Sequence, residues 1–550
     1  MMLKGEMMDA PLMISGILKH ADNCHGDREI VSRLPEDLST HRYGYSEAHT
    51  RTRQLANALT KKLKIKQSDR VSTIAWNTHR HFELYYGVSG IGAVVHTVNP
   101  RLDPAQIIWI LNHAQSKAVF FDKTFAPLID GIAKHCKTVK HWVLMTDSNH
   151  TKDVQTKCLA YEDLIDAQKP DYDWPEFDER AAAGLCYTSG TTGDPKGVLY
   201  SHRSTLLHAM TTCAADVIGV GAQGVLCPVV PMFHVNAWGI PYAAPMAGAK
   251  LVMPGPRLDG AGLHEMIEEE GVNYVAGVPT VWLGLLQYLR ENNKRIDGIE
   301  RVLIGGSALP EALLRVFEDE YGVTMQQGWG MTEMSPLGTV NTPLAKHIGI
   351  DREDEVKLKL KQGRLVYGVE MRIVDDEGNE MPWDGKSSGH VQVRGPWIAS
   401  GYYRGAGVEA FTDDGWMRTG DVAHLDSDGF MTITDRSKDV IKTGGEWVSS
   451  IDLENAAMGH PSVAMAAAIG MPHPKWDERP LLIVQLAPGA EPDGDSIKEY
   501  LAGVVPKLWI PDDVQFIEEM PIGATGKILK TKLREMFKDY QFPGTEGMGA

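Results

Sequence analysis

The chain has 550 residues, 43% of them hydrophobic, and a formal net charge of −17. This length exceeds what a single compact core usually supports, so we expect two or more domains. The negative balance argues against a general nucleic-acid or anionic-membrane surface, and a polyanionic ligand would have to be bound by local donors. The sequence contains no run of about 18 apolar residues, so no membrane span is predicted.

The cysteines are scattered and form no C-x-x-C pair; they are Cys24, Cys136, Cys158, Cys186, Cys213 and Cys227. This pattern fits a reducing compartment and offers no zinc-site spacing. Residues 1–11 carry charges before a short apolar stretch and do not resemble a signal peptide. We therefore expect a soluble, cytoplasmic protein.

Hydrophobic periodicity in the first part of the chain alternates between helical and strand-like segments. Helices are expected at residues 45–64, 81–90 and 104–113, and strands at 69–75, 93–98 and 118–121. The alternation returns further on, with helices expected at 204–214, 239–247 and 263–269, and strands at 225–229, 250–253, 274–278 and 301–304. This order is typical of parallel α/β sheets, and two α/β subdomains in series are the economical interpretation.

From about residue 365 the pattern changes to short alternating strands separated by Gly/Asp turns, which predicts antiparallel β-structure in the form of a small barrel. After residue 435 the pattern becomes mixed α+β. The sequence thus predicts an α/β fold, with a large N-terminal domain of two α/β subdomains plus a small β-barrel, followed by a small α+β C-terminal domain. We place the N-terminal domain at 1–434, a hinge at 435–439 and the C-terminal domain at 440–550.

Residues 187–197 read Tyr-Thr-Ser-Gly-Thr-Thr-Gly-Asp-Pro-Lys-Gly and join two expected strands. Glycines let backbone amides turn toward an anion, hydroxyls add neutral donors, and Lys196 adds a point charge. The order differs from a Walker A loop, because Lys196 precedes Gly197 and no Ser or Thr follows. A Ser/Thr/Gly-rich surface turn is the alternative interpretation.

Residues 219–224 match the G-x-G-x-x-G pattern of dinucleotide-binding proteins. In those proteins the pattern follows a strand and opens a helix, whereas here it follows an expected helix and enters an expected strand. A Rossmann-type site is therefore not predicted.

Six further segments place polar, charged or aromatic residues beside glycines or next to an expected strand. In chain order they cover residues 231–238, 305–310, 327–333, 416–421, 435–446 and 521–530. Together with residues 187–197, and in this order over most of the chain, they resemble the motifs of the adenylate-forming superfamily. That superfamily contains acyl-CoA synthetases, carrier-loading adenylation domains and luciferases.

The resemblance implies a site for ATP and Mg²⁺. Its nucleotide contacts would come from Thr188, Ser189, Gly190, Thr191, Thr192, Gly193, Lys196, Gly305, Gly306, Ser307, Ala308, Gln327, Gly328, Trp329, Asp421 and Arg436. Thr332 would hydrogen-bond the α-phosphate, and Glu333 would hold Mg²⁺ as a hard oxygen ligand. The carboxylate of Asp421 can accept hydrogen bonds from both ribose hydroxyls. Lys527 would bridge the substrate carboxylate and the α-phosphate, two anions that otherwise repel each other.

For the acyl pocket the resemblance implies His234, Trp238, Gly330 and Met331, with His234 orienting the carboxylate. Trp329 stands where Tyr is commoner in the family but keeps an aromatic face for adenine. Gly330 stands where acetate-specific members carry a tryptophan, which suggests room for a longer acid. Over the whole chain the resemblance is closest to bacterial short- and medium-chain acyl-CoA ligases, and 3-(methylthio)propionate is the specific acid expected.

The resemblance also implies a mobile C-terminal domain. Lys438 matches the family's hinge position, and Gly444, Gly445 and Glu446 would line the coenzyme A tunnel in a second half-reaction. In that step the C-terminal domain would swing away, removing Lys527 from the site.

Most of these residues also have a purely structural interpretation. His234 and Trp238 fit a hydrophobic core, residues 305–310 fit a plain strand-to-helix turn, and Arg436 and Lys438 fit ordinary solvated charges. Lys530 and Lys532, by contrast with Lys527, are expected to be solvated lysines on a helix.

The expected activity is ATP-dependent acyl-CoA ligation, in which a carboxylic acid, ATP and CoA give acyl-CoA, AMP and pyrophosphate through an acyl-adenylate. The expected partners are these small molecules and a second copy of the chain in a homodimer, without nucleic acid. One alternative is an adenylation enzyme that loads a free-standing carrier protein, since a fused carrier is not expected after Lys527. The other is a non-catalytic nucleotide-binding protein, against which the presence of Lys196, Glu333 and Lys527 argues.

Overall fold

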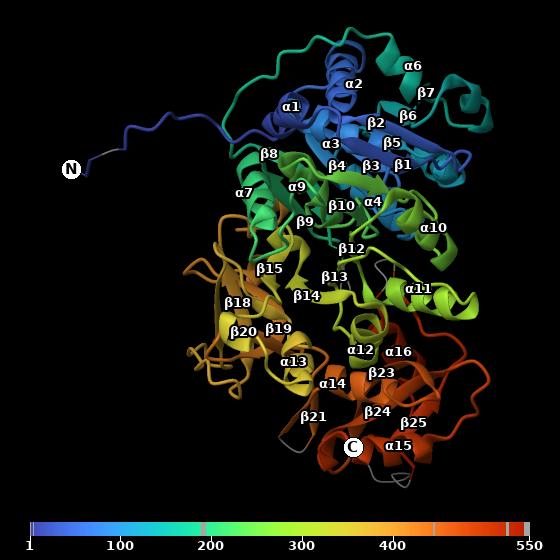
Figure 1. Ribbon diagram of the computed structural model, residues 1–550, viewed down its shortest axis with the longest axis vertical. Coiled ribbons are helices and arrows are strands. Elements are labelled where there is room, and N and C mark those ends of the chain that lie inside the picture. Colours follow the sequence, from blue (N-terminus) through green and yellow to red (C-terminus); the bar gives the residue numbers. More distant parts are fainter. Residues whose placement is uncertain (1, 4, 189–193, 444–445, 524–526, 544–550) are drawn as a thin grey trace.

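The computed structural model describes residues 2–3, 5–188, 194–443, 446–523 and 527–543 (Figure 1). The first of its three sheets has seven strands in the order β7-β6-β5-β3-β4-β8-β9. These are β3 (Arg70–Ile74), β4 (Val94–Thr97), β5 (Ser116–Phe121), β6 (His141–Leu144), β7 (Leu159–Ala160), β8 (Ala182–Tyr187) and β9 (Gly197–Ser201). All neighbours pair in parallel except β8 and β9, which form an antiparallel hairpin. The parallel sheet and the strand–loop–strand setting of residues 187–197 are thus confirmed.

The second sheet begins as a parallel sheet and continues into antiparallel strands, in the order β17-β18-β19-β20-β16-β15-β14-β13-β12-β10-β11-β1-β2. Its parallel strands are β10 (Val225–Pro228), β11 (Lys250–Met253), β12 (Tyr274–Gly277), β13 (Arg301–Ile304) and β14 (Thr324–Gly330). The antiparallel part, where the sequence predicts a small barrel, contains β15 (Leu337–Val340), β16 (Gly363–Leu365), β17 (Glu370–Val374), β18 (Gly389–Arg394), β19 (Met417–Leu425) and β20 (Phe430–Arg436). Residues 219–224 lie in a loop before β10, so they do not open a helix.

An N-terminal hairpin that is not predicted from the sequence completes the far edge of this sheet. It consists of β1 (Glu29–Arg33) and β2 (Thr40–Gly44), and β1 pairs in parallel with β11. The start of the chain is therefore built into the second subdomain, although residues 70–201 form the first.

Helices cover both sheets and fill the space between them. In the N-terminal domain they are α1 (Ile14–His25), α2 (Tyr45–Asn57), α3 (His79–Gly90), α4 (Pro104–His113), α5 (Ala126–Ile132), α6 (Tyr161–Asp166), α7 (His202–Cys213), α9 (Ile240–Ala247), α10 (Gly260–Glu270), α11 (Pro279–Glu291), α12 (Glu311–Arg315) and α13 (Arg352–Lys359). Every residue of α3 is buried, which places this helix in the centre of the domain rather than on its surface.

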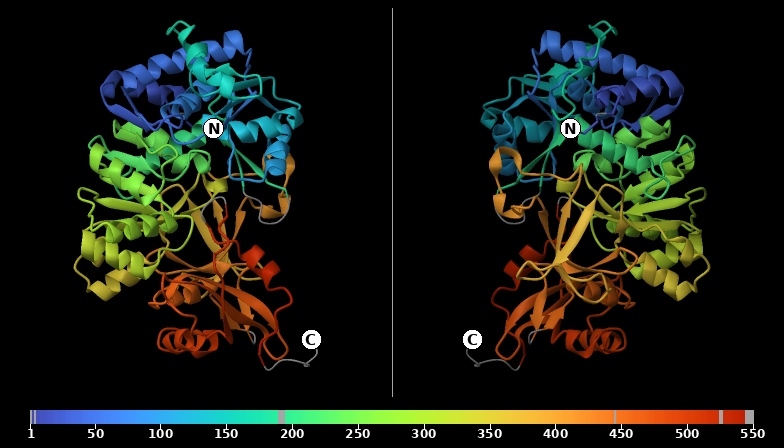
Figure 2. Two further views of the ribbon diagram at one scale, coloured as in Figure 1. Left: turned by 90° about the vertical axis from the view of Figure 1, so that its right-hand side faces the viewer. Right: turned by 90° about the vertical axis from the view of Figure 1, so that its left-hand side faces the viewer.

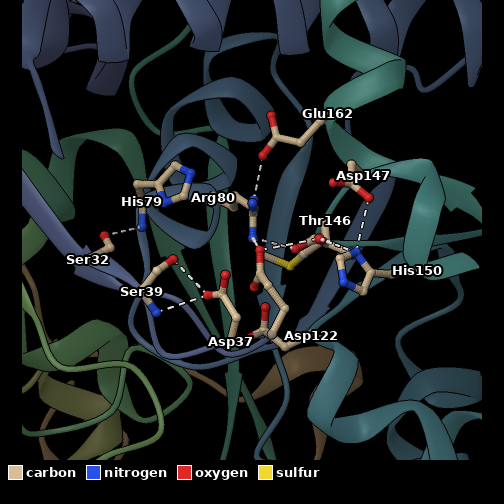
Figure 3. Close-up of polar contacts among 12 residues, drawn as sticks. Ser32, Asp37, Ser39, His79, Arg80, Asp122, Thr146, Asp147, His150 and Glu162 are labelled. Atoms are coloured by element: carbon tan, nitrogen blue, oxygen red, sulfur yellow. Dashed lines mark hydrogen bonds and ion pairs between the residues drawn. The ribbon is translucent and has the colours of Figure 1, made fainter. Parts of the chain in front are cut away.

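Because α3 is buried all round, its charged residues need partners. Arg80 donates to Glu162 Oε1 at 2.6 Å, to Glu36 Oε1 at 2.8 Å and to the carbonyl of Met145 at 2.8 Å (Figure 3). Nearby, the buried carboxylate of Asp122 accepts the backbone N–H of Trp76 at 2.7 Å. This polar network joins the segment after β1 to α3, α6 and the carboxyl ends of the first sheet.

The C-terminal part forms a third sheet at one end of the molecule (Figure 2). Its elements are β21 (Ile441–Thr443), β22 (Glu446–Val448), α14 (Ser450–Met458), β23 (Val463–His473), β24 (Asp477–Leu486), α15 (Gly494–Ala502), β25 (Asp513–Phe516) and α16 (Lys530–Met536). The chain leaves the second sheet at Arg436 and enters the third at Ile441. The connecting residues 437–440 overlap the predicted hinge at 435–439, whose first two residues are the end of β20.

Candidate active site

A cavity of about 490 Å³ is lined by residues from four places in the fold. They are the β8–β9 hairpin, called the phosphate-loop hairpin because residues 188–196 between its strands are the expected phosphate loop, the carboxyl end of β13, the β14–β15 segment, and Lys527. Among the residues identified from the sequence, its lining includes Thr188, Lys196, His234, Trp238, Gly305, Gly306, Gly328, Trp329, Gly330, Met331, Thr332, Glu333, Arg436, Lys438 and Lys527. These positions come from segments that lie far apart in the sequence. The fold thus brings most of the expected site together in one place.

Asp421, on β19, is held from two sides at the edge of this cavity. Its Oδ2 accepts the indole N–H of Trp329 at 3.0 Å, and its Oδ1 pairs with Arg436 Nε at 3.0 Å. The side chain of Asp421 is buried, whereas that of Arg436 is 45% exposed. The carboxylate is therefore fixed in one orientation, as recognition of a pair of neighbouring hydroxyls requires.

The segment Thr332–Glu333 is anchored through its backbone and through its carboxylate. The hydroxyl of Tyr200 donates to the Thr332 carbonyl at 2.7 Å, and the amide of Ala399 donates to the Glu333 carbonyl at 2.8 Å. The hydroxyl of Tyr402 donates to Glu333 Oε1 at 2.6 Å. Within the described residues no cluster of three or more His, Cys, Asp or Glu side chains could hold a metal ion. A single carboxylate beside bound phosphates suits Mg²⁺, which usually keeps several waters and takes one or two protein oxygens.

Lys196 lies on the phosphate-loop hairpin, lines the cavity and is partly exposed. The hairpin is closed by the Thr188 amide donating to the Lys196 carbonyl at 2.9 Å. The Lys196 ammonium lies 3.2 Å from Glu409 Oε1 and 5.1 Å from the ring centre of Tyr402. The expected phosphate contacts Ser189, Gly190, Thr191, Thr192 and Gly193 lie outside the described residues.

Lys527 enters the cavity from the C-terminal domain. A narrow hairpin presents it, with the Gly523 amide donating to the Lys527 carbonyl at 2.7 Å and the Leu529 amide donating to the Pro521 carbonyl at 2.8 Å. A Cβ built on Gly306 would lie 3.6 Å from Lys527 Cε, so the lysine chain passes close to the β13 turn. Burial and the positive charge of Arg436 lower the pKa of Lys527 to about 8.

Lys530 differs from the sequence expectation. It is not a solvated helix lysine, because its side chain is only 14% exposed and its Nζ lies 2.6 Å from Glu454 Oε1. It also contacts the hydroxyl of Ser450 at the start of α14. The periodicity of α16 could not reveal this ion pair, since the partner lies on another helix.

His234 and Trp238 flank an unusual turn in the cavity wall. Residues 235–238 (labelled α8, Val235–Trp238) all have φ between 45° and 56° and form one left-handed turn without glycine. Such a conformation costs roughly 1–2 kcal/mol per residue, so surrounding contacts must hold it. Asn236 supplies two, because its Oδ1 accepts from the Tyr85 hydroxyl at 3.2 Å and from the Cys186 thiol at 3.4 Å. Burial and the charge of Lys527 lower the pKa of His234 to about 4, so its imidazole is neutral at pH 7.

Two glycines of the cavity wall are explained by close approach of other groups. A Cβ on Gly305 would lie 3.1 Å from the Trp238 ring. The aromatic ring packed against this glycine is therefore that of Trp238. A Cβ on Gly330 would lie 1.9 Å from the Pro336 carbonyl oxygen. Gly330 is therefore required by the packing of β14 on the following segment. Gly330 also lines the cavity, so its effect on the width of the pocket stays a prediction.

Some expected residues do not line the cavity. Ser307 is exposed, Ala308 is half-buried, and Gln327 is buried with no partner for its side-chain oxygen within the described part of the chain. Glu446 lies on β22, opposite Thr443, and Gly444 and Gly445 lie outside the described residues.

The site also contains residues that were not predicted from the sequence, namely Tyr200, Val278, Pro336, Tyr402 and Arg418, of which all but Tyr200 line the cavity. Tyr200 and Tyr402 contact Thr332 and Glu333 across long sequence separations, so no local spacing marks these two tyrosines.

Comparisons with known proteins agree with this geometry. Residues 18–403 match the model of the AMP-binding enzyme family, and residues 452–527 match that of the AMP-binding enzyme C-terminal domain. A 3-methylmercaptopropionyl-CoA ligase of Ruegeria lacuscaerulensis is 50% identical over 97% of this chain and 99% of its own length. A medium-chain-fatty-acid–CoA ligase of Ectopseudomonas oleovorans is also 50% identical, over 97% of this chain and 98% of its own length.

Among solved structures, the anthranilate CoA ligase AuaEII in complex with anthranoyl-AMP superposes with a TM-score of 0.86. It is 24% identical, and the match covers 96% of this chain and 98% of that one, so it supports the fold. The family models and the two relatives at 50% identity show the family as well as the fold. This chain belongs to the AMP-binding enzyme family, the adenylate-forming group that its motifs resemble.

Proposed function

We propose that this protein is an ATP-dependent acyl-CoA ligase whose acid substrate is 3-(methylthio)propionate or another short- or medium-chain acid. It uses ATP, Mg²⁺ and coenzyme A and releases AMP and pyrophosphate. The observation that carries the proposal is that Lys527 reaches into a cavity that also contains Glu333 and borders the fixed carboxylate of Asp421. The names of the two relatives, each matched almost from end to end, support the reaction and the class of acid.

In the first step the acid carboxylate attacks the α-phosphorus of ATP, pyrophosphate leaves, and an acyl-adenylate forms. Lys527 lies between the carboxylate and the α-phosphate and offsets their mutual repulsion, which is the main contribution a protein makes to phosphoryl transfer. Lys196 holds the departing pyrophosphate, and Asp421 with Arg436 holds the ribose. Glu333 would hold Mg²⁺, which would supply neutralisation of the charge on the phosphate oxygens.

In the second step the CoA thiolate attacks the acyl-adenylate. We place the hinge for this step at Lys438, within 435–439, which divides the chain into domains 1–434 and 440–550. The change of sheet between Arg436 and Ile441 supports this division. Rotation there removes Lys527 and brings Gly444, Gly445 and Glu446 to the site. Neither chemical step needs a covalent protein nucleophile.

The acyl group occupies the part of the cavity bounded by His234, Trp238, Val278 and Met331. These side chains are apolar or, in the case of His234, neutral. A neutral wall suits a short aliphatic or thioether chain, because it leaves no buried charge unpaired.

The decisive experiment is a panel of C2 to C10 and sulfur-containing acids, incubated with ATP, Mg²⁺ and CoA, with AMP and thioester as the products measured. Formation of both, with the highest kcat/KM for 3-(methylthio)propionate, is expected. AMP without thioester on CoA, but with thioester on a carrier protein, would indicate a carrier-loading enzyme. Absence of acid-dependent AMP for every acid would favour a nucleotide-binding protein without catalysis.

We further propose that the protein acts in the cytoplasm as a homodimer. Its six cysteines form no disulfide in the structure, which fits a reducing compartment. No helix within the described residues is long and apolar enough to cross a membrane. Light scattering on the purified protein measures the oligomeric state directly.

A further inference from the structure

Tyr402 connects two parts of the site that act on the same leaving group. It lies after β18, lines the cavity, and begins the segment formed by residues 402–411. Its hydroxyl donates to Glu333 Oε1 at 2.6 Å, and the face of its ring lies 5.1 Å from the Lys196 ammonium. One side chain therefore contacts both the carboxylate expected to bind Mg²⁺ and the lysine of the phosphate loop.

The hydrogen bond determines how the Glu333 carboxylate is presented. Glu333 is 5% exposed, and among the described residues Tyr402 is the one side chain that hydrogen-bonds its carboxylate. With Oε1 occupied by the phenol, Oε2 remains for a metal ion. A carboxylate held in this way needs no reorientation when a cation arrives.

The segment itself is fixed on both sides. Arg418 donates to the carbonyls of Glu409 at 2.8 Å and Phe411 at 3.2 Å. At Gly407, where φ is 59°, a Cβ would lie 2.7 Å from Lys196 Nζ and 2.9 Å from the Tyr402 ring. A residue with a side chain at this position would push the lysine and the tyrosine apart. The glycine at 407 therefore leaves room for Lys196 to approach the Tyr402 ring.

We propose that Tyr402 is a positioning residue for the adenylation step, and that it sets the spacing between the Glu333 carboxylate and Lys196. Its hydroxyl orients the carboxylate toward a divalent cation, while its ring supports the ammonium that contacts pyrophosphate. The consequence is a specific one: removing the hydroxyl weakens binding of the magnesium–nucleotide complex more than binding of the nucleotide alone. A residue that only supported the fold would affect both equally.

The test uses Tyr402→Phe in the full-length protein, with Tyr403→Phe as the matched control. Tyr403 is the next residue, and its ring packs edge-on against His113 at 5.6 Å, away from Glu333. Calorimetry measures the Kd for ATP with Mg²⁺ and with EDTA. We expect Tyr402→Phe to raise the Kd with Mg²⁺ by about tenfold, the value of a hydrogen bond to a charged group, and to leave the Kd with EDTA unchanged. Tyr403→Phe should change neither value.

A parallel rise of both constants in Tyr402→Phe, or no change in either, would overturn the proposal. Because the inference rests on the proposed function, acid-dependent ATP–pyrophosphate exchange is measured on the same samples. We expect the KM for Mg²⁺ to rise in Tyr402→Phe, while thioester formation from supplied acyl-adenylate stays at the wild-type rate. Wild-type protein without exchange activity would refute the proposed function, and the calorimetric comparison would still decide the role of Tyr402.

Discussion

The indole N–H of Trp329 donates to Asp421 Oδ2 at 3.0 Å, so a residue expected only to face adenine also fixes the carboxylate expected to bind ribose. A phenylalanine at 329 would keep an aromatic face and lose the donor. We expect Trp329→Phe to raise the KM for ATP by about tenfold, because a hydrogen bond to a charged group is lost. The KM for the acid should not change. Pyrophosphate exchange at varied ATP measures both.

The control for this variant is Trp397→Phe, which also removes an indole donor. That indole bonds to the Leu337 carbonyl at 2.9 Å, and Trp397 does not line the cavity. It should lower thermal stability with little effect on the KM for ATP. Equal KM effects in the two variants would contradict a specific role for the Trp329–Asp421 contact.

Lys527→Ala should abolish carboxylate-dependent ATP–pyrophosphate exchange while supplied acyl-adenylate still yields thioester. The pH dependence offers a second readout on the wild type. Because burial lowers the pKa of Lys527 to about 8, its charge is lost as the pH rises through that value. The exchange rate should therefore fall above about pH 8, and the thioester step should lack this decline. Normal exchange in Lys527→Ala would refute the role assigned to this lysine.

Lys438→Pro should have the opposite effect, with adenylation retained and thioester formation lost. The proline ring locks the backbone φ angle and so restricts rotation at the proposed hinge. The two half-reactions are measured separately, by pyrophosphate exchange and by transfer from acyl-adenylate to CoA. Lys442→Pro, on β21 and beyond the proposed hinge, is the comparison variant. Loss of both half-reactions to the same extent in Lys438→Pro would count against a hinge at this residue.

Asp122 should make the stability of the protein depend on pH. Burial raises the pKa of this carboxyl from 3.8 to about 7. The folded state therefore holds the proton to higher pH than the unfolded state, and the stability from this site declines as the pH rises from about 4 to about 7. Asp122→Asn removes the titration and retains an acceptor for the Trp76 N–H. Its stability gain over the wild type should grow between pH 5 and pH 8, by up to about 3 kcal/mol.

Urea unfolding at several pH values measures this difference. Asp147→Asn, an exposed site in the same region (Figure 3), serves as the control and should show little change. A difference between Asp122→Asn and the wild type that does not vary with pH would show that the buried carboxyl does not titrate in this range.

Local patterns were sufficient to predict much of this fold. The expected segments 104–113, 250–253 and 301–304 coincide with α4, β11 and β13, because their apolar periodicity is strong and turn residues bound them. The β1–β2 hairpin was missed, since its stabilising partner β11 lies much further along the chain. Pairing of that kind leaves no trace in a local window.

The residues of the candidate site also divide into those that local sequence motifs predict and those that depend on distant partners. Segments carrying Lys196, Glu333 and Lys527 were predicted because they resemble motifs of a known family, and each motif is a local combination of residue types. The contacts of Tyr402 with Glu333 and of Lys530 with Glu454 were not found, because each joins two segments that are distant in the sequence. The local sequence around a tyrosine or lysine does not reveal such a contact, because the partner becomes a neighbour only in the folded structure.

The left-handed turn at residues 235–238 limits how the proposed acyl pocket can be redesigned. Trp238 is the obvious residue to shorten for a bulkier acid, yet its backbone stands at φ 56°, a conformation that favours glycine. Alanine would remove the packing of the ring on Gly305 and keep the backbone strain, whereas glycine would remove both. An engineered variant that accepts longer acids is thus better sought with glycine at 238. Any smaller residue other than glycine at 238 would lose the packing of the ring and keep the backbone strain. In a directed-evolution experiment such variants would be lost because they are unstable, before their substrate specificity could be selected.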